Sequence, residues 1–246
     1  MTLVFGEVAS IYDDVRPGYP DEVRQAIIAY AGKPPRAIVE LGAGTGKATE
    51  LLLRLGAPLT AVEPDPRMAD LLRGKFPQAT VEETTFEQWV PAEPPDLIAC
   101  ATAWHWMDAE TRNHRAFDRL APGGALAIFY HRYNVLDPAQ SDAIDELLTR
   151  IDPDVPDKDE HWVLDDVTAA GIWSDVREWR FHAHPVFGKE RYLALMQTFS
   201  PFRRHSAELR KRTLDGLGAL LDDFGGEITL ELRTTLVLGR KPGAPD

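Results

Sequence analysis

Three glycines stand close together in the run VELGAGTG, at residues 39–46. It follows the short apolar segment RAIVEL and precedes a segment in which apolar residues recur at helical spacing, namely Ala48, Leu51, Leu52 and Leu55. Strand, glycine turn and helix in this order are typical of the first unit of a parallel α/β sheet, because glycine reaches backbone conformations that a side chain disfavours. We therefore expect the main chain to turn sharply around a ligand here.

Strand-like apolar runs alternate with amphipathic segments through the first half of the chain, which predicts a Rossmann-like, doubly wound α/β sheet, mostly parallel, with helices on both faces. Strands are expected within residues 36–41, 59–63, 79–83, 96–101, 124–130 and 176–184. Helices are expected at residues 20–31, 66–74, 109–120, 138–150, 159–170, 190–199 and 206–224, the later ones forming a helical lid or insert. The final run ITLELRTTLVLGRK alternates apolar and polar residues, which predicts an antiparallel strand at or near a sheet edge.

The composition is that of an ordinary soluble globular protein, with 44% hydrophobic residues, 27% charged residues and a mean hydropathy of -0.27. No apolar run approaches the roughly 20 residues that span a bilayer, and the N-terminus MTLVFGEVAS lacks the features of a signal peptide. We therefore expect a cytoplasmic protein. The net charge of -12 argues against a nucleic-acid partner, because phosphate binding draws its affinity from clustered cations.

The sequence gives little sign of redox or metal chemistry. The lone cysteine, Cys100, stands in the apolar run DLIACA, which predicts a buried strand residue. The histidines are scattered, and although His182 and His184 share a face of a predicted strand, no cysteine or carboxylate pair accompanies them. We expect no metal ligands.

Two details of the glycine turn separate the ligands that bind there in open α/β sheets. A nicotinamide dinucleotide and S-adenosylmethionine both place a ribose and an adenine at such a turn, and Glu63 at the end of the second strand suits the ribose hydroxyls of either. The dinucleotide fingerprint has its third glycine three positions after its second, whereas Gly42, Gly44 and Gly46 are spaced by two. Glu40 would repel a pyrophosphate but could orient a cationic amino group. An aminoacyl nucleoside is therefore favoured.

Four stretches in this order resemble class I S-adenosylmethionine-dependent methyltransferases: VELGAGTG, the acidic strand end AVEPD, the aromatic ATAWHWMD, and LAPGGALAIFY. The opening ASIYDDVRPGYP and the late ALMQTFSPFRR are similar to the subgroup of small-molecule enzymes that contains trans-aconitate and ubiquinone-biosynthesis methyltransferases (methyltransferase type 11). The length of the chain favours one domain over residues 1–246. Within it we expect a lid segment at about 1–32, a cofactor-binding core at about 33–135, and acceptor-side helices with a C-terminal hairpin at about 136–246.

The resemblance implies which residues bind S-adenosylmethionine and its product S-adenosylhomocysteine. The expected contacts are Tyr12, Arg16, Glu40, Gly42, Ala43, Gly44, Glu63, Pro64, Met68, Thr85, Phe86 and Ala101. Glu40 and the glycine turn would line the methionine and ribose side, and Glu63 would accept from the ribose hydroxyls. Residues 64–68 and 85–86 would flank the adenine, and the main chain of Ala101 would touch the methionine group. Tyr12 and Arg16 would fold over the cofactor as part of the lid.

Residues on the acceptor side follow from the same resemblance. His105, just after the fourth strand, would lie near the cofactor methyl group and is the first candidate for a base or orienting group, against a packing role between its tryptophan neighbours. His131, at the end of the fifth strand, is the second candidate, against strand-end packing. Arg203 and Arg204 could clamp an acceptor carboxylate, against the simpler role of a solvated basic face.

The predicted function is transfer of a methyl group to a small-molecule acceptor, at an oxygen, nitrogen or carboxylate oxygen and less readily at carbon. Two alternatives stay open: a non-catalytic S-adenosylmethionine-binding module, and a nicotinamide-dependent oxidoreductase, which the glycine spacing disfavours. The protein is expected to act as a monomer or homodimer, without a membrane or nucleic-acid partner.

Overall fold

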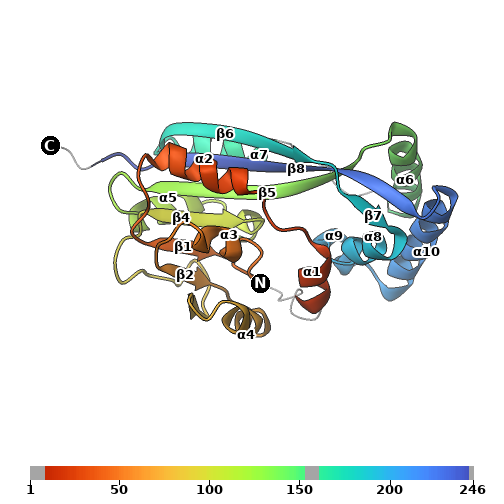
Figure 1. Cartoon of the computed structure of the whole chain (residues 1–246), viewed down its shortest axis with the longest axis horizontal. Helices are drawn as coiled ribbons and strands as arrows, with labels where there is room; N and C mark the ends of the chain where they lie inside the picture. Colours follow the sequence, from red (N-terminus) through yellow and green to blue (C-terminus); the bar gives the residue numbers. More distant parts are fainter. Residues whose placement is uncertain (1–8, 153–160, 244–246) are drawn as a thin grey trace. The chain divides into compact units, whose positions relative to one another are not determined.

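The computed structural model describes residues 9–152 and 161–243, and within them eight strands form one sheet in the order β3-β2-β1-β4-β5-β8-β6, with β7 paired to β8 (Figure 1). The strands are β1 (Ile38–Leu41), β2 (Leu59–Val62), β3 (Thr80–Glu82), β4 (Leu97–Ala101), β5 (Ala125–Val135), β6 (Ser174–Ala183), β7 (Val186–Gly188) and β8 (Glu227–Arg240). The helices are α1 (Ala9–Val15), α2 (Asp21–Ala31), α3 (Thr49–Leu53), α4 (Pro66–Lys75), η2 (Trp104–Trp106), α5 (Arg112–Arg119), α6 (Pro138–Ile151), α7 (Trp162–Ala169), α8 (Lys189–Met196), α9 (Ser200–Arg204) and α10 (Ala207–Asp223).

These elements fall into two compact units. The glycine-turn unit takes its described residues from Gly18–His131, Asp159–Phe181 and Thr234–Asp246, and the helical unit takes its own from Met1–Pro17, Arg132–Lys158 and His182–Arg233. This division differs from the three expected segments, because α2 and α7 bury apolar side chains in the core of the glycine-turn unit. The first eight residues of the expected lid lie outside the described part of the chain, and the single domain stays a prediction.

The parallel strands bring distant parts of the sequence to one edge of the sheet. β1 pairs in parallel with both β2 and β4, so that Leu41 lies opposite Val62 and Cys100 at the carboxyl ends of these strands. β3 pairs in parallel with β2, and β5 with β4. The residues that follow β1, β2 and β4 therefore meet at the same edge, where ligands bind in open α/β sheets.

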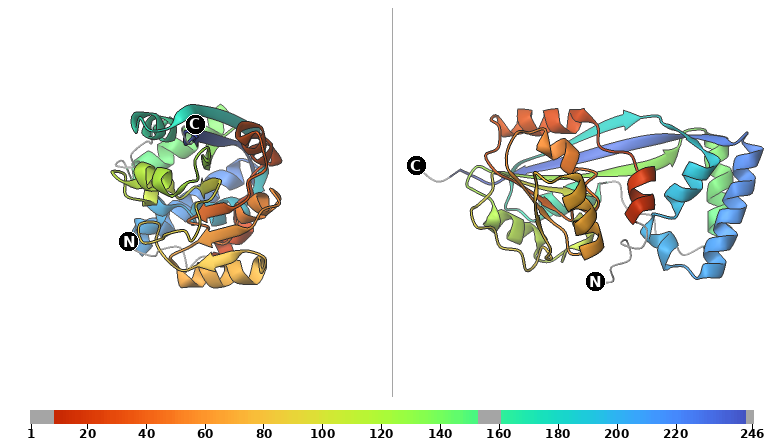
Figure 2. Two further views of the ribbon diagram at one scale, coloured as in Figure 1. Left: turned by 90° about the vertical axis from the view of Figure 1, so that its left-hand side faces the viewer. Right: turned by 60° about the horizontal axis from the view of Figure 1, so that its bottom comes forward.

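Two apolar layers cover the two faces of this sheet. In β4, Leu97 and Ala99 belong to a core that they share with α2 and α3, whereas Ile98 and Cys100 belong to a core that they share with α5 and α7. The two pairs of helices lie on opposite sides of the strands in the left view of Figure 2. The doubly wound sheet is thus confirmed, and Cys100 is the buried strand residue that its apolar neighbours predict.

The helices begin and end where their capping residues allow. The Asp65 carboxylate accepts a hydrogen bond from the Arg67 amide at 3.0 Å, and Pro66 stands at the first helical position of α4; both residue types are favoured at these positions. Pro20 is the N-cap residue of α2, which begins at Asp21, one residue later than the predicted start at residue 20. Gly32 ends that helix in the left-handed conformation, with φ of +73°.

The C-terminal strand β8 lies between β5 and β6, so β6 rather than β8 forms the sheet edge. β8 is antiparallel to β7, with Ile228 opposite Phe187, in agreement with the expected antiparallel strand. Its first half alternates buried and half-buried residues, whereas residues 234–239 are all buried. The alternation fades because neighbouring strands and helices cover both faces of the second half of the strand. The short elements β7, α9, α1 and η2 carry too few residues for a periodic signal, and the sequence does not predict them.

The helical unit has an apolar core of its own. α10 packs with α6 and α8, and α8 also packs with α1 (Figure 1). Leu217 and Leu221 of α10 are fully buried there, four residues apart on one helical face, together with Ile144 of α6. Among the described helices of the chain, none is both long enough and apolar enough to cross a membrane.

Candidate functional site

The glycine turn follows β1 and contains three residues whose backbone is in the left-handed conformation. The φ angles of Gly42, Gly44 and Gly46 are +65°, +58° and +89°. The amides of Gly42 and Ala43 both donate to the Val62 carbonyl, at 2.8 and 3.2 Å, which ties the turn to the end of β2. The spacing by two therefore reflects a backbone that needs a positive φ at every second residue, where a Cβ atom would add strain.

Each of these glycines meets different surroundings. A Cβ atom on Gly42 would lie 2.5 Å from Cβ of Ala103, and one on Gly46 would lie 2.4 Å from the Phe76 ring. A Cβ atom on Gly44 would meet no described atom within 4 Å except Met68 Sδ, at 3.9 Å. Gly42 and Gly46 thus serve close packing, whereas Gly44 leaves space for a ligand against the main chain.

Glu63 directly follows β2 and holds the turn from the other side. Its carboxylate accepts from the Gly44 amide at 2.8 Å and from the Asp65 amide at 2.9 Å. Burial raises the pKa of Glu63, and the two amide hydrogen bonds oppose that rise. A carboxylate offers about four acceptor positions, so Glu63 retains capacity for the ribose hydroxyls that the resemblance assigns to it.

Glu40, at the third position of β1, is buried, and its carboxylate accepts from Thr49 Oγ1 at 2.5 Å. Burial, together with the nearby Glu63 charge, raises the pKa of Glu40 to about 8, although the Thr49 hydrogen bond opposes the rise. A pKa of about 8 favours the protonated form of Glu40 at neutral pH, and a cation beside it would favour the ionised form. The sequence identifies this acid but not its protonation state, which depends on burial.

The residues expected around the adenine occupy two environments. Met68 is buried in the first turn of α4, beside Gly44, and Pro64 precedes it in the loop after β2. Phe86 is 5% exposed and lies in the core on the α5 side, with its ring centroid 6.4 Å from that of Trp104. The carbonyl of Thr85 accepts from the Trp89 amide at 2.9 Å. Contact of these residues with an adenine stays a prediction.

The loop after β4 carries His105 in the short helix η2. Ala101 ends the strand opposite Phe129 of β5, and η2 follows three residues later. The His105 ring is half-buried, with its centroid 4.8 Å from that of Trp106 and 6.4 Å from that of Trp162. The rings beside His105 thus include that of Trp106, its neighbour in the chain, and that of Trp162 in α7, which is distant in the sequence.

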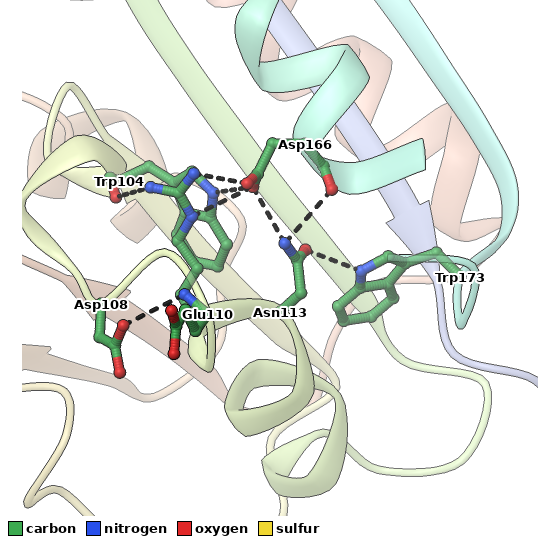
Figure 3. Close-up of polar contacts among 7 residues, drawn as sticks. Trp104, Asp108, Glu110, Asn113, Asp166 and Trp173 are labelled. Atoms are coloured by element: carbon green, nitrogen blue, oxygen red, sulfur yellow. Dashed lines mark hydrogen bonds and ion pairs between the residues drawn. The ribbon is translucent and has the colours of Figure 1, made fainter. Parts of the chain in front are cut away.

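A buried polar network fixes this loop against α5 and α7 (Figure 3). Asp166 of α7 accepts from Trp104 Nε1 at 2.8 Å, from Asn113 Nδ2 at 2.9 Å, and from Arg112 Nη2 at 2.5 Å. Arg112 also donates to the Trp104 carbonyl at 3.0 Å, and Trp173 Nε1 donates to Asn113 Oδ1 at 3.0 Å. The network thus anchors both the backbone and the indole of Trp104, next to His105 in the chain.

Sequence reasoning missed this network, although one signal points to it. Asp166 lies three residues after Val163 and one before Val167, both of which are buried, so it stands close to the inward face of α7. An acidic residue there needs a buried partner. The sequence alone does not say that this partner is Arg112.

His131 lies inside β5, which continues to Val135, so its expected place at the end of the fifth strand is wrong. Each of its ring nitrogens has a partner. Nε2 lies 3.2 Å from the Gly18 carbonyl, and Nδ1 lies 2.9 Å from Thr234 Oγ1. Because a carbonyl only accepts, Nε2 carries the proton of the neutral ring and Nδ1 accepts from Thr234. A role as base would require His131 to give up one of these bonds, which weakens its candidacy.

Tyr12 and Arg16 belong to the helical unit. The Arg16 guanidinium lies over the rings of Tyr12 and Phe199, at 4.7 Å from each centroid, and Arg16 Nε donates to Thr198 Oγ1 at 2.9 Å. The aromatic neighbours and Thr198 thus hold Arg16 in one position within this unit. Its expected contact with a cofactor, like that of Tyr12, stays a prediction.

Arg203 lines a hollow of about 370 Å³ in the same unit, formed by residues of α9 and α10 and by Gln197. Arg210 and Lys211 also line it, and Lys211 Nζ is paired with Asp215 Oδ2 at 2.5 Å. The basic stretch is therefore partly a lining rather than only a solvated face. Whether Arg203 or Arg204 binds an acceptor carboxylate stays a prediction.

Known proteins resemble this chain in sequence and in fold. The family described as "Methyltransferase domain" matches residues 15–206. An uncharacterized methyltransferase of Mycobacterium tuberculosis is 35% identical over 133 residues, which is 53% of each chain. A trans-aconitate 2-methyltransferase of Delftia acidovorans is 37% identical over 99 residues, 38% of this chain and 37% of that protein. The matched region thus spans about half or less of these relatives.

The structure is similar to that of a proposed type II methyltransferase from Anaeromyxobacter dehalogenans, with a TM-score of 0.71 and 20% identity over 92% of this chain and 99% of the other. The sheet order, the left-handed glycine turn and the acidic end of β2 define the class I methyltransferase fold. The chain belongs to the methyltransferase domain family.

Asp166→Ala is expected to lower the free energy of unfolding by about 3–5 kcal/mol, because it leaves the guanidinium of Arg112, 7% exposed, without its carboxylate. Denaturant unfolding followed by circular dichroism measures the change. The matched control is Asp165→Ala, an exposed neighbour in the same helix, with an expected cost of at most about 1 kcal/mol. Equal losses in the two variants would contradict the assigned role of the network.

Glu40 should make stability depend on pH in a defined window. Its folded pKa of about 8 lies above the ordinary value of 4.5, so between these values the folded state keeps a proton that the unfolded state loses. The free energy of unfolding is therefore highest at the acid end of this window and falls as pH rises toward about 8.

Glu40→Gln keeps an acceptor for Thr49 and should flatten this pH dependence, as measured by denaturant unfolding at several pH values across the window. Glu50→Gln, at an exposed position of α3, is the matched control. Its free energy of unfolding should change with pH as steeply as that of the wild type. A slope unchanged by Glu40→Gln would show that Glu40 ionises normally in the folded protein.

Proposed function

We propose that this chain transfers a methyl group from S-adenosylmethionine to a small-molecule acceptor and releases S-adenosylhomocysteine. The observation that carries the proposal is the space beside Gly44, where an added Cβ would meet no described atom within 4 Å except Met68 Sδ at 3.9 Å. The Glu63 carboxylate borders this space through the Gly44 amide, at the place where a ribose hydroxyl could reach it. Membership of the methyltransferase domain family supports the same assignment.

The acids at the turn suit a cationic nucleoside better than a diphosphate. A diphosphate would add negative charge beside Glu63 and would disfavour the ionised form of Glu40. A cationic amino or sulfonium group near Glu40 instead favours its ionised form and lowers its pKa from about 8. Cofactor binding at neutral pH should then release a proton from Glu40, and the fit to S-adenosylmethionine is electrostatic as well as steric.

When bound, S-adenosylmethionine supplies a methyl group on a positively charged sulfur, which is already a good electrophile. The protein then has to hold the acceptor in line with that methyl group and to exclude water, a proximity effect of roughly 7–11 kcal/mol. A hydroxyl or amine acceptor would gain a further factor of about 10²–10⁴ from a general base. A carboxylate acceptor needs none.

His105 is the base or orienting group in this proposal. It follows β4 at the edge where the glycine turn and Glu63 also lie, and its ring is half-buried against Trp106 and Trp162. The network around Asp166 fixes the adjoining Trp104, so the loop has a defined conformation before any ligand binds. A group held in place in this way loses little freedom when the acceptor arrives.

Small polar metabolites are the proposed acceptors, methylated at an oxygen or nitrogen atom. The Delftia relative is named for trans-aconitate, which makes a carboxylate-bearing acceptor one member of the class to test. The net charge of -12 disfavours a nucleic acid as acceptor. A cytoplasmic location and a monomeric or homodimeric state are parts of the same proposal.

The experiment that tests the proposal has two stages. Calorimetry with S-adenosylhomocysteine should give a dissociation constant in the micromolar range, and a fluorescence titration with NADH should give no binding. Methyl-labelled S-adenosylmethionine is then offered with a panel of carboxylic acids that includes trans-aconitate, and with alcohols and amines. Tight binding without labelled product from any member would favour a non-catalytic binding module, and absence of binding would refute the proposal.

Glu63→Ala is expected to weaken the binding of S-adenosylhomocysteine by about 1–3 kcal/mol, because it removes the charged acceptor for the ribose and releases the Gly44 amide. Calorimetry measures the loss. Glu83→Ala is the matched control, because Glu83 is partly exposed and paired with Arg73. This variant should bind S-adenosylhomocysteine with the affinity of the wild type. Equal affinities in all three proteins would place the ribose elsewhere.

His105→Ala should lower turnover by about 10²-fold or more and leave the affinity for S-adenosylhomocysteine unchanged, as expected for a group that acts on the acceptor. Initial rates with an acceptor from the panel and calorimetry measure the two effects. His114→Ala, an exposed histidine of α5, serves as the control and should change neither. Full turnover in His105→Ala would assign His105 to packing.

A further inference from the structure

A residue with an uncommon backbone conformation stands directly after β4. Thr102 has a φ of +55°, in the left-handed region. For a β-branched residue this is a genuine outlier, because the substituents on Cβ crowd the main chain. Among the described residues one other that is not glycine has a positive φ, Asp175 at +52°, and aspartate is a type that tolerates this region.

Thr102 lies beside the glycine turn. Its neighbour Ala103 is the residue that a Cβ on Gly42 would approach to 2.5 Å, so the two loops are in close contact. The Thr102 amide still donates to the Phe129 carbonyl of β5, at 2.9 Å, which means that strand pairing continues up to this residue. The chain thus turns at Thr102 itself, directly after the paired part of β4.

The unusual conformation brings the Thr102 hydroxyl to that of Tyr19. The two oxygens lie 2.7 Å apart, and either can be the donor. The Tyr19 ring is held on two sides, since it stacks on His131 at 4.3 Å with an interplanar angle of 19° and meets the edge of Phe129 at 4.7 Å. His131 is itself fixed by its bonds to Gly18 and Thr234. The hydroxyl pair is therefore firmly positioned at the carboxyl edge of the sheet.

Strained residues persist only where the surrounding structure holds them, and they cluster at active sites. We propose that the hydroxyl pair of Thr102 and Tyr19 binds the reacting group of the methyl acceptor. This inference rests on the proposed function and names its acceptor class, which is a small molecule that reacts through a hydroxyl or an amine. His131 then acts as the platform for Tyr19 rather than as a base.

The chemistry of the pair sets this class. A hydroxyl oxygen accepts a hydrogen bond from an O–H or N–H group and so directs the lone pair of that atom toward the methyl group. Bound S-adenosylmethionine would supply the methyl group and keep the electrons of the carbon–sulfur bond on its sulfur, and the proton of the acceptor would pass to His105, the base of the proposed function. A carbon acceptor offers no such hydrogen bond, and a carboxylate has no proton to give and could only accept from the pair.

Two variants separate a role in binding the acceptor from a role in folding. Thr102→Gly removes the hydroxyl and relieves the left-handed strain. Its Tm should therefore stay unchanged or rise by about 2–4 °C, while its turnover should fall at least tenfold. Tyr19→Phe keeps the ring on His131 and should raise KM for the acceptor and lower kcat/KM by about tenfold or more, as expected for a lost hydrogen bond to the substrate. Both variants should bind S-adenosylhomocysteine as the wild type does.

Matched controls carry the same changes at sites away from the turn. Asp175→Gly relieves the other left-handed residue and should leave turnover unchanged. Tyr30→Phe removes a hydroxyl that donates to the Asp175 carbonyl at 2.6 Å, so it should lower Tm and spare turnover. Tm comes from thermal unfolding, affinity from calorimetry, and turnover from methyl-labelled S-adenosylmethionine with the panel of alcohols, amines and carboxylic acids.

The outcomes distinguish this inference from the proposed function. Normal turnover in Thr102→Gly and Tyr19→Phe, or turnover by the wild type that is confined to carboxylic acids, would overturn the inference and leave methyl transfer standing. A fall in Tm of Thr102→Gly, with turnover lost only in proportion to unfolding, would assign Thr102 to structural support. A wild type that binds S-adenosylhomocysteine but methylates no member of the panel would remove both proposals.

Discussion

The carboxyl edge of the sheet depends on one close contact, between the main chain at Gly42 and Cβ of Ala103. Parallel pairing of β1 with β2 and β4 brings the three strand ends into register, and only a residue without a side chain fits at Gly42. The Glu63 carboxylate then holds Gly44 from the β2 side. The space beside Gly44, the placement of His105 and the turn at Thr102 all follow from this packing.

Buried charge has opposite consequences in two parts of the glycine-turn unit. Asp166 and Arg112 neutralise each other, and Trp104 and Asn113 supply the further hydrogen bonds that a buried ion pair needs. Glu40 accepts a hydrogen bond from a hydroxyl, and its pKa rises to about 8. The first arrangement fixes a loop, whereas the second leaves an acid whose protonation depends on what lies beside it. A cationic ligand beside Glu40 would favour its ionised form.

Polar side chains that follow β4 or stand within β5 divide into supports and candidates for chemistry. Both nitrogens of His131 in β5 have protein partners, and its ring supports Tyr19, so these contacts explain its position without catalysis. His105 is held by aromatic contacts, and Thr102 is held in a strained conformation against the hydroxyl of Tyr19. The same edge thus offers an imidazole on one loop and a hydroxyl pair close by.

Local periodicity and residue types with strong backbone preferences indicate most of the strands and helices, the glycine turn, and the acids Glu40 and Glu63 from the sequence. The contact of Asp166 with Arg112, the place of β8 inside the sheet edge, and the contact of Thr102 with Tyr19 appear only in the folded chain. These features join residues dozens of positions apart, and no local preference fixes such pairs. Strand register and burial select them, and burial also sets the protonation of Glu40.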